Sequence, residues 1–85
     1  MLTNQKINKM EINDFIQNFA DQFEETDASE LTATTVFRDI KEWSSLIALS
    51  IIAMVDEEYD VTLKGDDIRK SKTIEDLFNL VQSRL

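Results

Sequence analysis

The apolar residues at the start of the chain recur at helical spacing. In residues 11–24, "EINDFIQNFADQFE", successive apolar positions lie four, three and four residues apart, and Phe15 widens the stripe. These positions are Ile12, Ile16, Phe19 and Phe23. Polar residues occupy the opposite side, which is typical of a helix that packs one face on a core. The pattern predicts an amphipathic helix over residues 11–24.

Residues 45–58 contain the most hydrophobic segment of the chain. A buried strand is the alternative interpretation of "LIALSIIAMV", but the run is long for a strand, and Ala48, Ala53 and Met54 favour a helix. This helix is apolar almost all round. Because a domain of 85 residues cannot bury a helix completely, we expect part of it to face solvent or a partner. We expect some of four residues to lie there, namely Ile47, Ser50, Ile51 and Met54.

Two further helical segments follow a long connection. Residues 25–43 show no sustained period and are predicted to be an ordered loop. Residues 66–70 suggest a short helical turn, and residues 74–84 a last helix that begins with a capping box of Thr73 and Asp76. The chain is therefore predicted to form a small all-α bundle of three main helices and one short helix. Residues 11–85 make a single domain, and residues 1–10 an N-terminal extension or the start of the first helix.

Charge and composition narrow the function. The chain has 17 acidic and 9 basic residues, a formal charge of −8. That charge argues against binding to nucleic acid or to an anionic membrane, and favours a basic protein partner. The absence of cysteine and histidine removes the common zinc sites and Ser–His or Cys–His catalysis. With no apolar run of transmembrane length and no signal-like start, we expect a cytoplasmic protein without membrane insertion.

A doubled serine, Ser44-Ser45, stands directly before the most hydrophobic segment. A serine in this place is most often an N-cap, whose hydroxyl accepts a backbone N–H of the first helical turn. A helix N-terminus also suits a phosphate, because its free N–H groups and dipole favour an anion. One cap needs only one serine, so the second needs another explanation, such as attachment of a phosphate group, or none.

From about residue 10 to residue 85, the chain resembles the acyl carrier protein family. The resemblance is carried by the order of the segments, by Ser44-Ser45-Leu46 in place of the family's Asp-Ser-Leu, and by "DEEYDV" and "TIEDLFNLV". It implies that a phosphopantetheinyl transferase attaches 4′-phosphopantetheine to Ser45. The thiol of this arm would carry acyl groups as thioesters, which agrees with a chain that lacks cysteine. The protein would then serve enzymes without being one.

The resemblance also implies two surfaces. Acyl-loading and acyl-transfer enzymes would dock their basic patches on the second helix, at Leu46, Ile47, Met54, Asp56, Glu57 and Glu58. The acyl chain would be held among the helices, in a pocket formed by Leu49, Ile52, Ile68 and Ile74, with Leu46 as a further candidate.

Three departures from the family pattern indicate a specialised carrier. Ser44 replaces the motif aspartate, Ile47 and Ser50 stand where acidic residues are common, and Trp43 precedes the site. We expect a discrete, monomeric bacterial carrier in a dedicated pathway of fatty acid, lipid or secondary metabolite biosynthesis.

Two other functions compete with the carrier. An unmodified helical interaction module would use the apolar face of helix 45–58 as its interface, with Ser45 as a cap. A calcium loop over "DEEYDVTLKGDD" has acidic residues at alternate positions, but its sixth residue is Val61 where the turn requires glycine. Catalysis by the many carboxylates is the weakest alternative, because in an acidic chain most of them are solvated surface.

Overall fold

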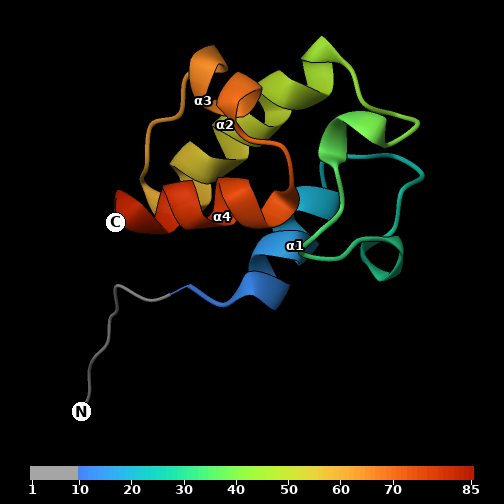
Figure 1. The fold of residues 1–85 in the computed structure, drawn as a ribbon, viewed down its shortest axis with the longest axis horizontal. Helices are drawn as coiled ribbons and strands as arrows, with labels where there is room; N and C mark the ends of the chain where they lie inside the picture. Colours follow the sequence, from blue (N-terminus) through green and yellow to red (C-terminus); the bar gives the residue numbers. More distant parts are fainter. Residues whose placement is uncertain (1–9) are drawn as a thin grey trace.

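The computed structural model describes residues 10–85 as a small all-α bundle (Figure 1). Its helices are α1 (Ile12–Ala20), α2 (Ser45–Tyr59), α3 (Gly65–Lys70) and α4 (Ile74–Ser83). Two 3₁₀ turns, Ala28–Glu30 and Phe37–Asp39, lie in the connection between α1 and α2. No β-strand forms within residues 10–85. The predicted fold class is confirmed, whereas the extension predicted for residues 1–10 lies, apart from Met10, outside the described residues.

The aromatic residues of α1 form the centre of the core. Phe15 and Phe19 are fully buried, and the ring of Phe15 meets that of Phe78 on α4 at 5.7 Å between centroids. The ring of Phe19 meets that of Phe37, from the α1–α2 connection, at 6.0 Å. Rings at such distances gain from edge-to-face and tilted contacts as well as from burial. Figure 1 shows the resulting arrangement, with α4 lying horizontally and α2 running diagonally above it in this view.

The side of α2 that faces the core differs from the prediction. Of the four candidates for the outer face, Ile51 is fully buried and Met54 is 6% exposed, so these two are wrong, whereas Ile47 and Ser50 are partly exposed. The large exposed residues of α2 are Leu46, at 75%, and Leu49, at 61%. Positions 47, 51, 54 and 55 follow the three- and four-residue spacing of one helix face, which is the face turned inward. Because both faces are apolar, the sequence contained no polar side to mark the outside.

The connection between α1 and α2 is ordered, as predicted, and is fixed to the last helix. The backbone of Val36 pairs with Thr73 in an isolated bridge. The N–H of Ile74 donates to the carbonyl of Thr35 at 3.1 Å, and that of Glu75 to the carbonyl of Ala33 at 2.8 Å. These bonds satisfy the free N–H groups of the first turn of α4. They also set where the connection delivers the chain to α2.

The helix ends follow local capping rules. Thr73 and Asp76 form the predicted box, in which the N–H of Asp76 donates to the Thr73 hydroxyl at 3.1 Å and the N–H of Thr73 donates to the Asp76 carboxylate at 3.0 Å. The first helix is shorter than predicted. After Ala20 the chain tightens, and the N–H of Phe23 donates to the carbonyl of Ala20 at 3.0 Å. Phe23 remains buried in spite of this change.

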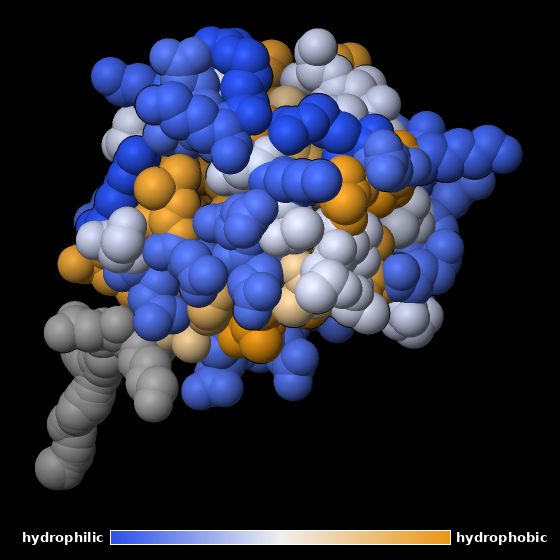
Figure 2. All heavy atoms as spheres, viewed as in Figure 1, coloured by the Kyte–Doolittle hydropathy of each residue, from blue (hydrophilic) through white to orange (hydrophobic). Residues whose placement is uncertain are grey.

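Hydrophilic residues cover most of the face seen in Figure 2, and apolar residues show between them as separate patches. Among the helices of residues 10–85, none has both the length and the apolar character needed to cross a membrane.

Candidate functional site

The two adjacent serines occupy different positions at the start of α2. Ser44 is the N-cap: its backbone is extended, with φ −158° and ψ 171°, and its hydroxyl oxygen accepts the N–H of Ile47 at 3.2 Å. Ser45 is the first helical residue and is exposed. Within residues 10–85, the Ser45 hydroxyl makes no hydrogen bond to any other group. One serine therefore caps the helix and the other presents a free hydroxyl.

The surroundings of Ser45 suit an attached anion. The first turn of α2 contains no acidic residue, although the chain as a whole is strongly acidic. The free N–H groups and the positive end of the helix dipole lie at this turn. A phosphodiester on the Ser45 hydroxyl would be stabilised there by the backbone itself.

An open groove of about 360 Å³ begins at Ser45. It lies between α2, α3 and the segment before α2. Its lining consists of Arg38, Trp43, Ser45, Ala48, Leu49, Ile52, Gly65, Ile68 and Arg69. Most of these side chains are apolar, and no acidic side chain is among them. A group attached to Ser45 therefore has an apolar surface within reach.

Trp43 forms the aromatic wall of the groove. It is half-buried, and its ring contacts that of Phe37 at 4.9 Å between centroids and stacks on that of Phe19 at 6.5 Å, with the planes 9° apart. The wall is thus continuous with the aromatic core and has little freedom to move.

Two arginines from distant segments hold α3, which forms the opposite wall. The Arg38 guanidinium donates to the carbonyl of Ile68 at 2.9 Å and to that of Ser71 at 2.6 Å, both at the C-terminal end of α3. Arg84 donates to both carboxylate oxygens of Asp67, at 2.8 and 2.9 Å. These hydrogen bonds from Arg84, with one from the N–H of Lys64, lower the pKa of Asp67 to about 2. A helix of six residues needs such external support, because it is too short to be stable alone.

The groove contains part of the predicted acyl pocket. Leu49, Ile52 and Ile68 line it, although Leu49 is also largely exposed. Ile74 does not line it, because this residue is fully buried in the first turn of α4. The residues that sequence reasoning did not assign to the pocket are Arg38, Trp43, Ala48, Gly65 and Arg69. Only Trp43 carried a signal, as an unusual residue directly before the doubled serine.

The predicted docking residues are not all at the surface. Within residues 10–85, Leu46 is the most exposed large apolar residue, and Asp56, Glu57 and Glu58 are exposed at the other end of α2. Ile47 is half-buried against the core, and Met54 is buried. Met54 therefore cannot contact a docked partner without a change in the core, and Leu49 takes its place on the outer face.

The twelve residues proposed as a calcium loop do not form one loop. The first four belong to the end of α2, Val61 is buried, and the last three belong to α3. Within residues 10–85, no group of three or more acidic side chains is arranged to hold a metal ion.

Ser45 thus places an exposed hydroxyl next to a largely apolar groove. Comparison of the chain with family models, with curated proteins and with solved structures gives no match. The function proposed below is accordingly based on the residues of this site and on the pattern of the sequence.

Proposed function

We propose that this chain is an acyl carrier protein. In this proposal the Ser45 hydroxyl carries a 4′-phosphopantetheine arm, and the thiol of the arm holds acyl groups as thioesters for partner enzymes. The observation that supports it most directly is the division between the two serines. Ser44 provides the cap, so that Ser45 is exposed, unbonded within residues 10–85, and adjacent to the groove.

The arm supplies the chemistry that the chain lacks. The chain has no cysteine, so a thioester requires an imported thiol. Attachment by a phosphopantetheinyl transferase would place a phosphodiester at the N-terminus of α2, where the dipole favours it. The protein would act as the substrate of successive enzymes and would not itself be a catalyst.

The groove offers a place for the carried acyl group. Its volume of about 360 Å³ falls at the small end of the range for ligand pockets, about 300–1,000 Å³. Leu49, Ile52 and Ile68 present apolar surface to it, which would shelter a short acyl chain from water. We further propose that the carrier acts as a monomer in a dedicated biosynthetic pathway in the cytoplasm.

Partner enzymes would dock on the outer face of α2. The exposed side chains of Leu46 and Leu49 lie at the end that holds Ser45, and the carboxylates of Asp56, Glu57 and Glu58 lie at the other end. An apolar contact flanked by acidic groups fits an enzyme surface with a basic patch, because charge complementarity speeds and orients association.

The exposed leucines also support a second candidate, an unmodified interaction module. Leu46 and Leu49 are 75% and 61% exposed on one helix, an arrangement that usually marks an interface. In that case the protein would bind its partner through this face and Ser45 would remain unmodified.

Mass spectrometry of the intact protein separates the two. The full chain is incubated with coenzyme A and each of several phosphopantetheinyl transferases. We expect a 4′-phosphopantetheine adduct on the wild type and on Ser44→Ala, which is the matched control, and none on Ser45→Ala. The absence of an adduct with every transferase would favour the interaction module. An adduct that persists on Ser45→Ala would move the attachment site to Ser44.

A further inference from the structure

The groove beside Ser45 has a charge opposite to that of the chain. The protein carries −8, yet two of its three arginines, Arg38 and Arg69, line this groove. None of its 17 acidic residues lines it. Asp66 stands next to the lining and pairs with Arg69, so one positive charge remains in excess. A purely hydrocarbon acyl group could form neither a hydrogen bond nor an ion pair with these guanidinium groups.

Arg38 is fixed in place. Its guanidinium donates to the carbonyls of Ile68 and Ser71 and lies 5.0 Å from the centre of the Phe37 ring. A guanidinium has five N–H donors, and within residues 10–85 these two bonds leave three without a partner. A fixed cation with free donors binds an anion without first having to be ordered, which lowers the entropic cost.

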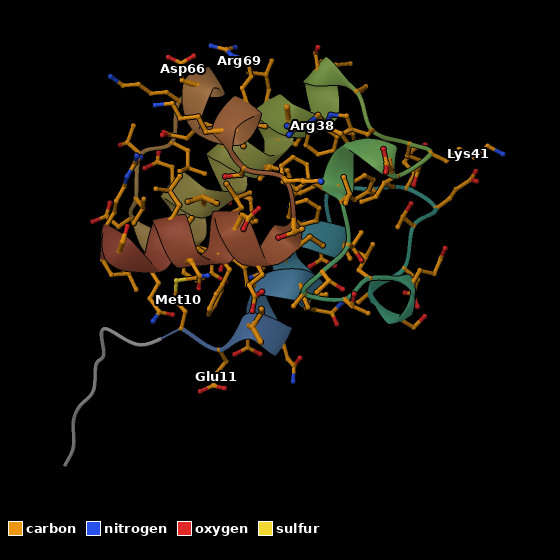
Figure 3. All side chains as sticks on the ribbon, in the orientation of Figure 1. Met10, Glu11, Arg38, Lys41, Asp66 and Arg69 are labelled. Carbon is orange, nitrogen blue, oxygen red and sulfur yellow. The ribbon has the colours of Figure 1, made fainter. Side chains whose placement is uncertain are left out.

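Arg69 is the second arginine that lines the groove. It pairs with Asp66 one turn earlier on α3, and both side chains extend outward side by side in Figure 3. The Arg69 side chain is 73% exposed, and an exposed pair of this kind contributes little to stability. A second carboxylate that enters the groove can therefore compete with Asp66 for the guanidinium.

From this charge distribution we infer that the groove selects an acyl group whose far end is a carboxylate. The apolar part of the acyl chain would lie on Ala48, Ile52 and Ile68, and its carboxylate would reach the guanidinium groups of Arg38 and Arg69. Among side-chain cations, the planar guanidinium of arginine is the one whose paired N–H donors match the two oxygens of a carboxylate. The inference rests on the proposed carrier function only for how the acyl group arrives, because the preference is a property of the groove.

Soluble thioesters test the preference on the unmodified full chain. The N-acetylcysteamine thioesters of adipic and hexanoic acid have chains of equal length, and only adipoyl ends in a carboxylate. Binding is followed by the fluorescence and the indole N–H signal of Trp43, the one tryptophan of the chain and part of the groove. We expect adipoyl to bind about two- to fivefold more tightly than hexanoyl, as for an exposed ion pair. The preference should weaken as salt is added.

Variants assign the preference to the arginines. In Arg69→Gln we expect the two thioesters to bind with nearly equal affinity. The control is Lys70→Gln, which removes the same charge from the next residue of α3 but does not alter the groove lining, and it should keep the preference. Arg38→Gln should weaken it as well, with circular dichroism used to check that α3 and the fold are retained.

Three results would overturn the inference. The first is equal binding of adipoyl and hexanoyl to the wild type, and the second is a lack of binding by either. The third is a preference that persists in Arg69→Gln and Arg38→Gln.

The phosphate of the arm is the other possible anion, and 4′-phosphopantetheine itself serves as its probe. If Arg69→Gln weakens the binding of 4′-phosphopantetheine but leaves the thioester preference unchanged, the arginines bind the phosphate of the arm and not the acyl group. Because none of these measurements uses attachment to Ser45, failure of the carrier function is detected separately.

Discussion

The carboxylate of Glu42 accepts the hydroxyl of Thr26 at 2.7 Å and the N–H of the same residue at 2.8 Å. It also accepts the N–H groups of Glu24 and Glu25 at 3.2 and 3.0 Å. One side chain thus joins the segment that follows α1 to the residue before Trp43. The hydrogen bond from the Thr26 hydroxyl, followed by those from the backbone N–H groups, lowers the pKa of Glu42.

Glu42→Gln should therefore lower the melting temperature at neutral pH. Glutamine places an NH₂ group where the backbone presents N–H donors, so at least one of these bonds is lost. Because the folded-state pKa of Glu42 is lowered, its stabilisation is present above the unfolded pKa and is lost as the pH falls through the folded value. The difference between the variant and the wild type should accordingly shrink on acidification. Glu25→Gln, which alters a side chain outside this cluster, is the control, and an equal loss in both variants would contradict the assignment.

The ion pair between Asp67 and Arg84 predicts a second pH dependence. The folded-state pKa of Asp67 is about 2, against an ordinary value of 3.8. The pair therefore stabilises the protein fully above about pH 4, and this contribution is lost as the pH falls toward 2. Arg84 is more than one third exposed, so solvent screening keeps the effect small. In urea unfolding, Asp67→Asn should have a lower free energy of unfolding than the wild type at pH 7, and the difference should be smaller near pH 2. Asp66→Asn, in the exposed pair with Arg69, should change stability less, and the reverse order would refute the role of Asp67.

The two serines should differ in stability as well as in modification. Ser44→Ala removes the acceptor for the N–H of Ile47 and should cost about 1 kcal/mol, a typical value for an N-cap. Ser45→Ala alters an exposed helical position and should change the free energy of unfolding by less than about 0.5 kcal/mol. Ser44→Asp should restore the stability lost in Ser44→Ala, because aspartate caps a helix and suits its dipole. Urea titrations of the three variants would test these expected values. A larger loss in Ser45→Ala would show that Ser45 has a structural role.

Substitutions in α2 test which face is buried. Ile51→Ala removes a fully buried side chain and should destabilise the protein by about 2–5 kcal/mol. Leu49→Ala, on the outer face of the same helix, should cost less than about 0.5 kcal/mol. The pair changes similar volumes in one helix, so the contrast reports burial and not helix propensity. Similar losses at both positions would mean that the outer face is covered.

The buried face of a helix was predictable from the sequence only where the opposite side of that helix is polar. In α1 and α4, polar residues opposite the apolar stripe marked the outside, and Phe15, Phe19, Leu77 and Val81 are buried as the pattern requires. In α2 the apolar residues continue around the helix, and the period could not show which of two apolar faces packs on the core. The inward face is set by contacts with α1, which is remote in sequence.

The candidate site was predictable in part for a similar reason. The caps at Ser44 and Thr73 are local, and their signals lie within a few residues. The groove depends on Arg38 reaching carbonyls 30 and 33 residues away, which no local pattern encodes. The expectation that Ile74 lines the pocket came from the family resemblance, and α4 instead turns this residue into the core.

The acidic end of α2 has a further consequence. Asp56, Glu57 and Glu58 lie near the negative pole of the helix, and the last turn contains no basic residue to compensate. In a chain of charge −8, this concentration of like charge opposes folding. A basic surface that covers these carboxylates relieves the repulsion and, by binding the folded state, raises the melting temperature. If a partner docks at this end of α2 as proposed, its binding would therefore also stabilise the folded protein.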